Sequence, residues 1–133
     1  MRSATIARAA LALVPLCLVL GGCAAVAAGA GAAAAIAYSE RGVSSKVEGS
    51  PAQVFQRSQA VFRDLGITET GHEMGDTGTE HELKGRRGDL EITVDMHREN
   101  DTLTSVDVYA QKSAVEFDRD YARQVLEAII ARS

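Results

Sequence analysis

The sequence has no tryptophan, and phenylalanine and tyrosine together supply only 6 of its 133 residues (3 + 3). This scarcity disfavours the aromatic stacking platforms that bind single-stranded nucleic acids. Residues 38–133 carry 12 basic and 18 acidic side chains, a net charge of −6 (12 − 18). Such a charge disfavours a surface for nucleic acids or anionic membranes, and no cofactor motif is present.

The first acidic residue is Glu40, and the segment before it has the three parts of an export signal. Residues 1–10 are short and basic, residues 11–20 are apolar, and Gly21-Gly22-Cys23 follows. The apolar run is too short to cross a bilayer, which requires about 20 residues. The uncharged stretch continues to Ala37, however, so an uncleaved transmembrane helix is the alternative interpretation.

Leu20-Gly21-Gly22-Cys23 resembles the lipobox of bacterial lipoproteins. The resemblance implies that residues 1–22 are a signal peptide cleaved between Gly22 and Cys23, and that Cys23 carries the lipid that anchors the chain. Two or more acyl chains give stable membrane anchoring. Ala24 follows in place of the aspartate that marks inner-membrane retention in lipoproteins, which implies the outer membrane, facing the periplasm. Cys17 would be lost with the signal, leaving no free thiol for a disulfide.

Residues 23–41 are predicted to be a tether, with Cys23 lipidated and the rest rich in alanine and glycine. Ala24–Ala37 holds ten alanines and two glycines in fourteen positions. Such low complexity is typical of a linker. A segment for self-association or membrane contact is the alternative, because small residues allow helices to pack closely.

Residues 42–133 are predicted to form one small α+β domain. We expect a two-layer sandwich, with two helices on one face of an antiparallel sheet of about four strands, in the order β-α-β-β-β-α or with one further strand. The expected strands are 43–49, 67–71, 79–84, 89–98 and 103–111, and the expected helices are 51–65 and about 118–131. Ser50 and Pro51 predict the first helix start, and Gly66 predicts its end.

Strict alternation of apolar and polar residues over 90–97 is the clearest strand pattern in the chain. Burial of the apolar positions predicts the register with the next strand, which sets Val94 opposite Val108 and Met96 opposite Val106.

This register also sets Asp95 opposite Asp107 on the solvent face, with His97 and Ser105 next along the strands. Two carboxylates near a histidine could hold a divalent cation or act in acid–base chemistry. The alternative is a solvated sheet face whose charges have no catalytic or binding role.

His72 and His81 are the other candidates for a metal site. Pairing the faces of Ile67 and Leu83 sends the two histidines to opposite faces of the sheet, which favours two ordinary surface histidines.

Residues 85–88 (Gly-Arg-Arg-Gly) are predicted to form a turn, and with Lys84 they make a compact basic tip. This tip, containing Lys84, Arg86 and Arg87, is the best candidate for contact with an anionic partner such as cell-wall polymer or lipid headgroups. A solvated turn is the alternative.

The whole chain resembles a family of small bacterial lipoproteins catalogued as a domain of unknown function. The resemblance depends on the order of segments and on Gly21-Gly22-Cys23, the Ala/Gly run ending at Tyr38, a Ser-Pro-x-x-Val-Phe helix start, Leu65-Gly66-Ile67, and Leu90-Glu91-Ile92-Thr93-Val94. It implies an envelope location and no catalytic residues.

We therefore expect a structural or interaction module of the cell envelope, not an enzyme. Its partners would be the membrane, through acyl chains on Cys23, and an envelope protein or cell-wall polymer. The strand beginning at Val43 or the strand beginning at Thr79 would offer an edge for pairing. A periplasmic module that binds a small ligand or a metal is the alternative.

Overall fold

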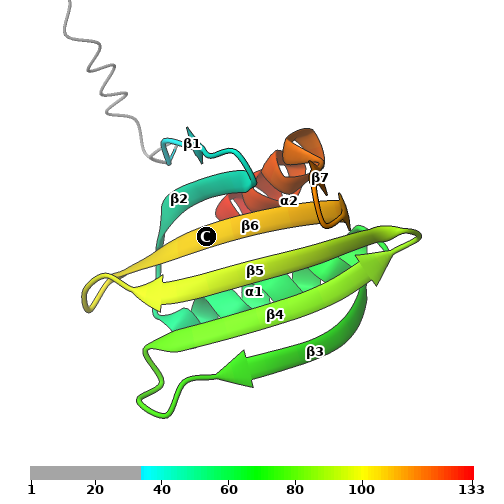
Figure 1. The fold of residues 1–133 in the computed structure, drawn as a ribbon. Helices are drawn as coiled ribbons and strands as arrows, with labels where there is room; N and C mark the ends of the chain where they lie inside the picture. Colours follow the sequence, from blue (N-terminus) through cyan, green and yellow to red (C-terminus); the bar gives the residue numbers. More distant parts are fainter. Residues whose placement is uncertain (1–33) are drawn as a thin grey trace, which may run out of the picture.

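The computed structural model describes residues 34–133 (Figure 1). The predicted signal peptide, the cleavage site at Gly22 and Cys23, and most of the predicted tether lie outside these residues. The elements in chain order are β1 (Ala37–Tyr38), β2 (Gly42–Glu48), α1 (Pro51–Asp64), β3 (Thr68–Met74), β4 (Glu80–Arg87), β5 (Leu90–Arg98), β6 (Leu103–Ser113), β7 (Glu116–Phe117) and α2 (Arg119–Ala131).

The α+β class is confirmed, but within residues 34–133 the antiparallel sheet has seven strands and not about four. The strand order is β1-β2-β6-β5-β4-β3, and β7 pairs with β6. Without the two-residue strands β1 and β7, the element order is β-α-β-β-β-β-α, one of the two orders expected. Two residues are too few for a periodic pattern, so sequence alternation could not predict β1 or β7.

The end of the predicted tether is part of the domain. Ala37 and Tyr38 pair with Ser44 and Val43 of β2, and Ile36 packs against the core. The hydroxyl of Ser45 donates a hydrogen bond to the carbonyl of Ala35 at 3.0 Å. The chain therefore joins the sheet before residue 42, where the predicted domain begins.

The sequence signals at the two ends of α1 are confirmed. Ser50 caps α1 in a reciprocal capping box with Gln53, and Pro51 occupies the first turn. Gly66 follows the helix with a φ of +68°, a left-handed conformation that glycine adopts without strain. Asp118 caps α2 by accepting a hydrogen bond from the backbone N–H of Tyr121.

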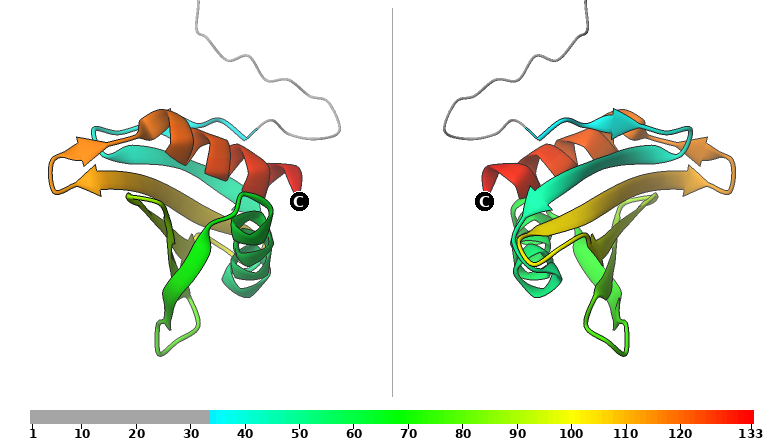
Figure 2. Two further views of the ribbon diagram at one scale, coloured as in Figure 1. Left: turned by 90° about the vertical axis from the view of Figure 1, so that its right-hand side faces the viewer. Right: turned by 90° about the vertical axis from the view of Figure 1, so that its left-hand side faces the viewer.

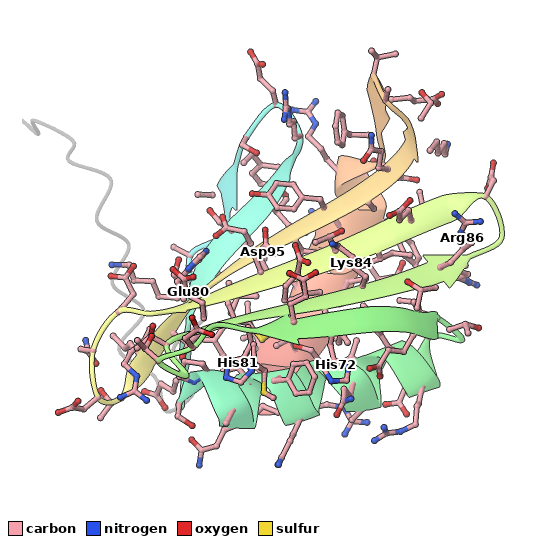
Figure 3. The ribbon with its side chains drawn as sticks, turned by 60° about the horizontal axis from the view of Figure 1, so that its bottom comes forward. His72, Glu80, His81, Lys84, Arg86 and Asp95 are labelled. Atoms are coloured by element: carbon pink, nitrogen blue, oxygen red, sulfur yellow. The ribbon has the colours of Figure 1, made fainter. Side chains whose placement is uncertain are left out.

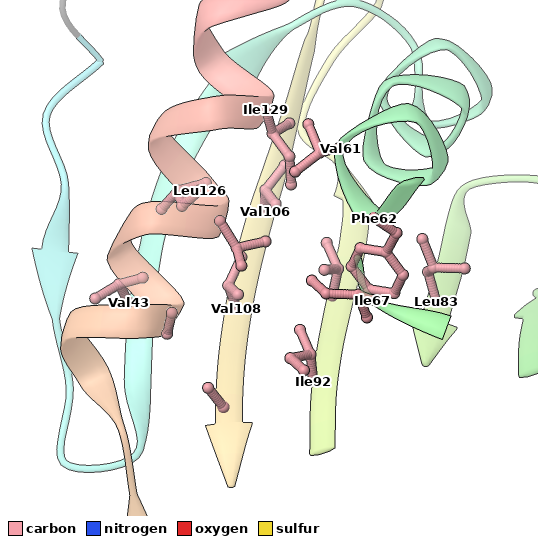
Figure 4. Close-up of a cluster of buried hydrophobic side chains, with 14 of the residues drawn as sticks. Val43, Val61, Phe62, Ile67, Leu83, Ile92, Val106, Val108, Leu126 and Ile129 are labelled. Atoms are coloured by element: carbon pink, nitrogen blue, oxygen red, sulfur yellow. The ribbon is translucent and has the colours of Figure 1, made fainter. Parts of the chain in front are cut away.

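Both helices pack on one face of the sheet (Figure 2). α1 lies against β3, β4 and β5, and α2 lies against β2 and β6. The apolar side chains of alternate strand positions point to this face and meet those of the helices (Figure 4). The fully buried members include Val43, Phe62, Leu83, Ile92, Val94, Val106, Val108, Leu126 and Ile129.

The turn predicted at residues 85–88 is wrong. Gly85 lies inside β4, paired with Ile92, and the turn is formed by Gly88 and Asp89 between Arg87 and Leu90. A Cβ at Gly85 would lie 2.6 Å from Phe62 Cε2, so this glycine is required by close packing and not by a turn. Gly88 has a φ of +63°, as a tight hairpin turn demands.

The strand predicted at 67–71 is longer and lies at the edge of the sheet as β3. Almost every residue of β3 is exposed, so it lacks the apolar alternation that marks a half-buried strand. Pairing with β4 shifts register between Glu69 and Gly71, as in a β-bulge. Because β3 covers β4, the strand beginning near Thr79 is not an edge, contrary to expectation.

Candidate functional site

A row of four carboxylates crosses the face of the sheet that the helices leave open. Direct cross-strand partners are Glu73 with Glu82, Glu82 with Asp95, and Asp95 with Asp107. The predicted register of Asp95 with Asp107 is confirmed, as is that of His97 with Ser105. We call these four residues, Glu73, Glu82, Asp95 and Asp107, the acidic row.

Two members of this row, Glu73 and Glu82, were not predicted from the sequence. Glu82 follows from the register of β4 with β5, but Glu73 reaches the row only because the bulge in β3 shifts its pairing by one residue. Alternation in the sequence carries no signal for such a shift.

The folded protein disfavours the ionised forms of two carboxylates in the acidic row. Partial burial raises the pKa of Asp95 to about 6, and the neighbouring carboxylate of Glu82 adds to the rise. Burial also raises the pKa of Asp107. Like charges directly opposite one another destabilise a sheet, so the row has a cost in the folded state.

Lys84 partly neutralises the row on the same face of β4. Its Nζ lies 2.6 Å from Glu82 Oε1, and this hydrogen bond raises the pKa of Lys84. His97 Nδ1 lies 3.4 Å from Glu80 Oε1 on the neighbouring row of cross-strand pairs. Lys84 therefore contacts the acidic row directly through Glu82, whereas His97 pairs with a carboxylate beside the row.

A hollow of about 330 Å³ lies at the end of the acidic row nearest the turn between β3 and β4. Its lining consists of Glu73, Met74, Gly75, Glu80, His81, Glu82, Asp95 and His97. Such a surface can accept a cationic group such as a lysine, an arginine or an organic amine. Within residues 34–133, no three His, Cys, Asp or Glu side chains are placed to hold one metal ion.

The prediction for His72 and His81 is wrong, because the two histidines lie on the same face. His72 pairs with Leu83 after the bulge, and both rings lie 5.5 Å from the ring of Phe55 between β3 and α1 (Figure 3). His81 is buried, and its Nδ1 has no hydrogen-bond partner among the described residues. Their role here is aromatic packing beneath the edge strand.

The predicted basic tip does not form one patch. Lys84 and Arg86 point to the open face from β4, whereas Arg87 points to the helix face. Arg86 lies 3.9 Å from Glu91. The guanidinium of Arg87 lies 5.5 Å from the ring centre of Tyr121 and donates to its hydroxyl at 3.2 Å.

Neither helix within residues 34–133 has the length and hydrophobicity needed to span a membrane. The predicted lipidation site Cys23 and the adjacent Gly22 lie outside the described residues, so their prediction stands on the sequence.

The fold and the acidic row define a small α+β domain with one helix-covered face and one polar face. The chain belongs to the family described as "Protein of unknown function (DUF3568)", whose model matches residues 5–131. The match covers the predicted leader as well as the domain. No curated protein matches the chain.

Proposed function

We propose that this protein is a bacterial lipoprotein anchored through acyl chains on Cys23 and located at the outer membrane, facing the periplasm. The observation that carries the proposal is the sequence Leu20-Gly21-Gly22-Cys23, placed directly after an apolar run of ten residues. Residues 1–22 would be removed as a signal peptide, and Ala24 after the cysteine favours the outer membrane.

The arrangement of the domain supports this proposal. β1 brings the chain into the domain at the surface, since Ala37 and Tyr38 are both exposed. Only ten residues lie between Cys23 and Ala34, a span of 11 residue-to-residue steps (34 − 23), so an anchored domain would remain within about 40 Å of the lipid at full extension.

The molecular role that we propose is that of an interaction module, not an enzyme. The helices and the sheet would form a two-layer α+β sandwich that presents its open face to an envelope protein. The acidic row supports this role, because a folded domain that retains opposed carboxylates gains from a basic partner that neutralises them.

Metabolic labelling with a fatty acid tests the anchor. The Cys23→Ala variant should lose the lipid label and accumulate as a precursor, because the acyl acceptor is absent. Cys17→Ala is the matched control, since it removes the other cysteine and should leave labelling intact. Equal labelling of the wild type and Cys23→Ala would refute the anchor.

Crosslinking in intact cells tests the interaction. A photoreactive residue replacing Thr93 lies on the open face beside the acidic row, and one replacing Gln124 lies exposed on α2. We expect an envelope protein crosslinked from position 93 and not from position 124. Crosslinks to cell-wall polymer alone would show that the partner is a polymer and not a protein. The absence of crosslinks at both positions would contradict the interaction role.

A second candidate function, binding of a small cationic ligand, is favoured by the hollow at the end of the acidic row. Native mass spectrometry of the full chain released from detergent, with spermidine as the probe, tests it. We expect an adduct with wild type that is lost in the Glu82→Gln variant, and no adduct with wild type would dismiss this candidate.

A further inference from the structure

Two arginines of α2 lie against the strand through which the chain enters the domain. Arg119 and Arg123 are one helical turn apart, so both face β1. Arg119 Nη1 donates to the carbonyl of Ser39 at 3.4 Å, and Arg123 Nη1 donates to the hydroxyl of Tyr38 at 3.5 Å. Tyr38 is 55% exposed, so its ring is available to a partner.

Arg41 adds a third guanidinium in the connection between β1 and β2. Among residues 34–133, no carboxylate lies within 4.0 Å of Arg41 or Arg119. Arg123 is paired with Glu127 at 3.5 Å. Acidic residues Glu40, Asp118, Asp120 and Glu127 lie on or next to the same segments, so this side of the domain has no excess of positive charge and is close to neutral. We call Tyr38, Arg41, Arg119 and Arg123 the entry surface.

The opposite end of the domain is strongly acidic. Residues 64–83 contain six acidic side chains and no lysine or arginine. This stretch includes all of β3, and its turn into β4 lies at the far end of the molecule from β1 and α2 (Figure 1, Figure 2). The net charge of −6 is therefore unevenly distributed, with most of the excess far from the entry surface.

We propose that the entry surface docks on the anionic phospholipid headgroups of the membrane that holds the anchor, with the turn between β3 and β4 pointing away. This docking rests on the proposed anchoring at Cys23. Arginine binds phosphate through parallel hydrogen bonds, and tyrosine is favoured at the level of the headgroups. The negative surface potential of the membrane repels residues 64–83 much more strongly than the nearly neutral entry surface, and this difference orients the domain with the entry surface toward the membrane.

The geometry of the chain agrees with this orientation. Ile36 packs against the core, and the carbonyl of Ala35 accepts a hydrogen bond from Ser45. The chain therefore leaves the domain beside the entry surface. The ten residues between Cys23 and Ala34 keep this exit within about 40 Å of the lipid. The net charge of the whole domain disfavours membrane contact, but contact through this one side places the acidic end away from the bilayer.

Tryptophan fluorescence can test the docking, because the sequence has no tryptophan of its own. The full lipidated chain would be reconstituted in vesicles of equal phosphatidylcholine and phosphatidylglycerol, with brominated phospholipid as a quencher. Tyr38→Trp reports the entry surface, and Met74→Trp, at a side chain 63% exposed at the other end, is the control. We expect quenching several-fold stronger for Tyr38→Trp, reduced at least by half when Arg119→Gln and Arg123→Gln are added.

Equal quenching of the two variants in protein that floats with the vesicles would overturn the docking and leave the anchor intact. Protein that fails to float would contradict the anchor itself, and the docking with it. Hydrogen exchange of the unsubstituted lipidated protein gives an independent readout if a variant does not fold. Residues 37–42 should exchange several-fold more slowly in these vesicles than in neutral detergent, with residues 74–80 unchanged, and equal rates would overturn the docking.

Discussion

The ring of Phe62 on α1 lies directly over the backbone of Gly85 in β4, where a side chain of any kind would collide with it. Phe62 is 1% exposed and Gly85 is buried, so the contact is at the centre of the packing between α1 and the sheet. The same glycine is also close to Ile67 Cγ2, at 2.6 Å from a built Cβ. The helix can approach the sheet closely because position 85 has no side chain.

Gly85→Ala should therefore destabilise the fold. An added methyl group in a packed core forces neighbouring side chains to shift, at a cost of about 1–3 kcal/mol. Urea unfolding would measure the change in the free energy of unfolding. Gly71→Ala in β3 is the matched control, because a Cβ there meets nothing within 4 Å. Equal stability of the two variants would contradict the packing described for α1.

Asp95→Asn should stabilise the protein at neutral pH. The pKa of Asp95 in the folded protein, about 6, exceeds its ordinary value of 3.8, so the folded state favours the protonated form. The stability due to protonation is complete below about pH 4 and is lost as the pH rises through about 6. The asparagine variant, which is neutral throughout, should exceed wild type by about 1 kcal/mol at pH 8, since solvent screens this half-exposed site.

Urea unfolding at a series of pH values measures this difference between wild type and Asp95→Asn. The two curves should converge as the pH falls below 4, because Asp95 of the wild type then becomes protonated in both the folded and the unfolded state. Asp101→Asn, at an exposed position, removes the same charge and should leave the pH dependence unchanged. A difference in the free energy of unfolding between Asp95→Asn and wild type that stays constant from pH 4 to 8 would show that ionisation of Asp95 does not destabilise the folded state.

Ser50→Ala should weaken the start of α1 by about 1 kcal/mol, because it removes the side-chain acceptor for the N–H of Gln53. Thermal unfolding followed by circular dichroism measures this loss as a lower Tm. Ser113→Ala at an exposed position serves for comparison and should leave the Tm within experimental error of wild type. An unchanged Tm for Ser50→Ala would mean that the capping box contributes nothing to stability.

The parts of the fold that the sequence predicts correctly are those with one buried face. Val94, Met96, Val106 and Val108 alternate with polar residues, and a shift of one residue would expose them all, so burial determines the register of β5 with β6. The predicted opposition of Asp95 and Asp107 follows from that register. The two ends of α1 were also predictable, since capping residues act locally.

The parts that the sequence does not predict depend on contacts between distant residues. The sequence predicts a turn at Gly85, because nothing local shows that this glycine packs against Phe62, which lies 23 positions earlier in the chain (85 − 62). The bulge in β3 has no sequence signature, and it moves His72 to the helix face and Glu73 into the acidic row. An exposed edge strand has no buried face that would fix its register in advance.

The proposed anchor and both proposed surfaces depend on Cys23 being the lipidated first residue of the mature protein. Intact mass spectrometry of the protein extracted from bacterial membranes can show whether this is so. We expect a chain that begins at Cys23 and carries the added mass of a diacylglycerol and an N-linked acyl group. A chain that begins at Met1 with an unmodified cysteine at position 23 would contradict it.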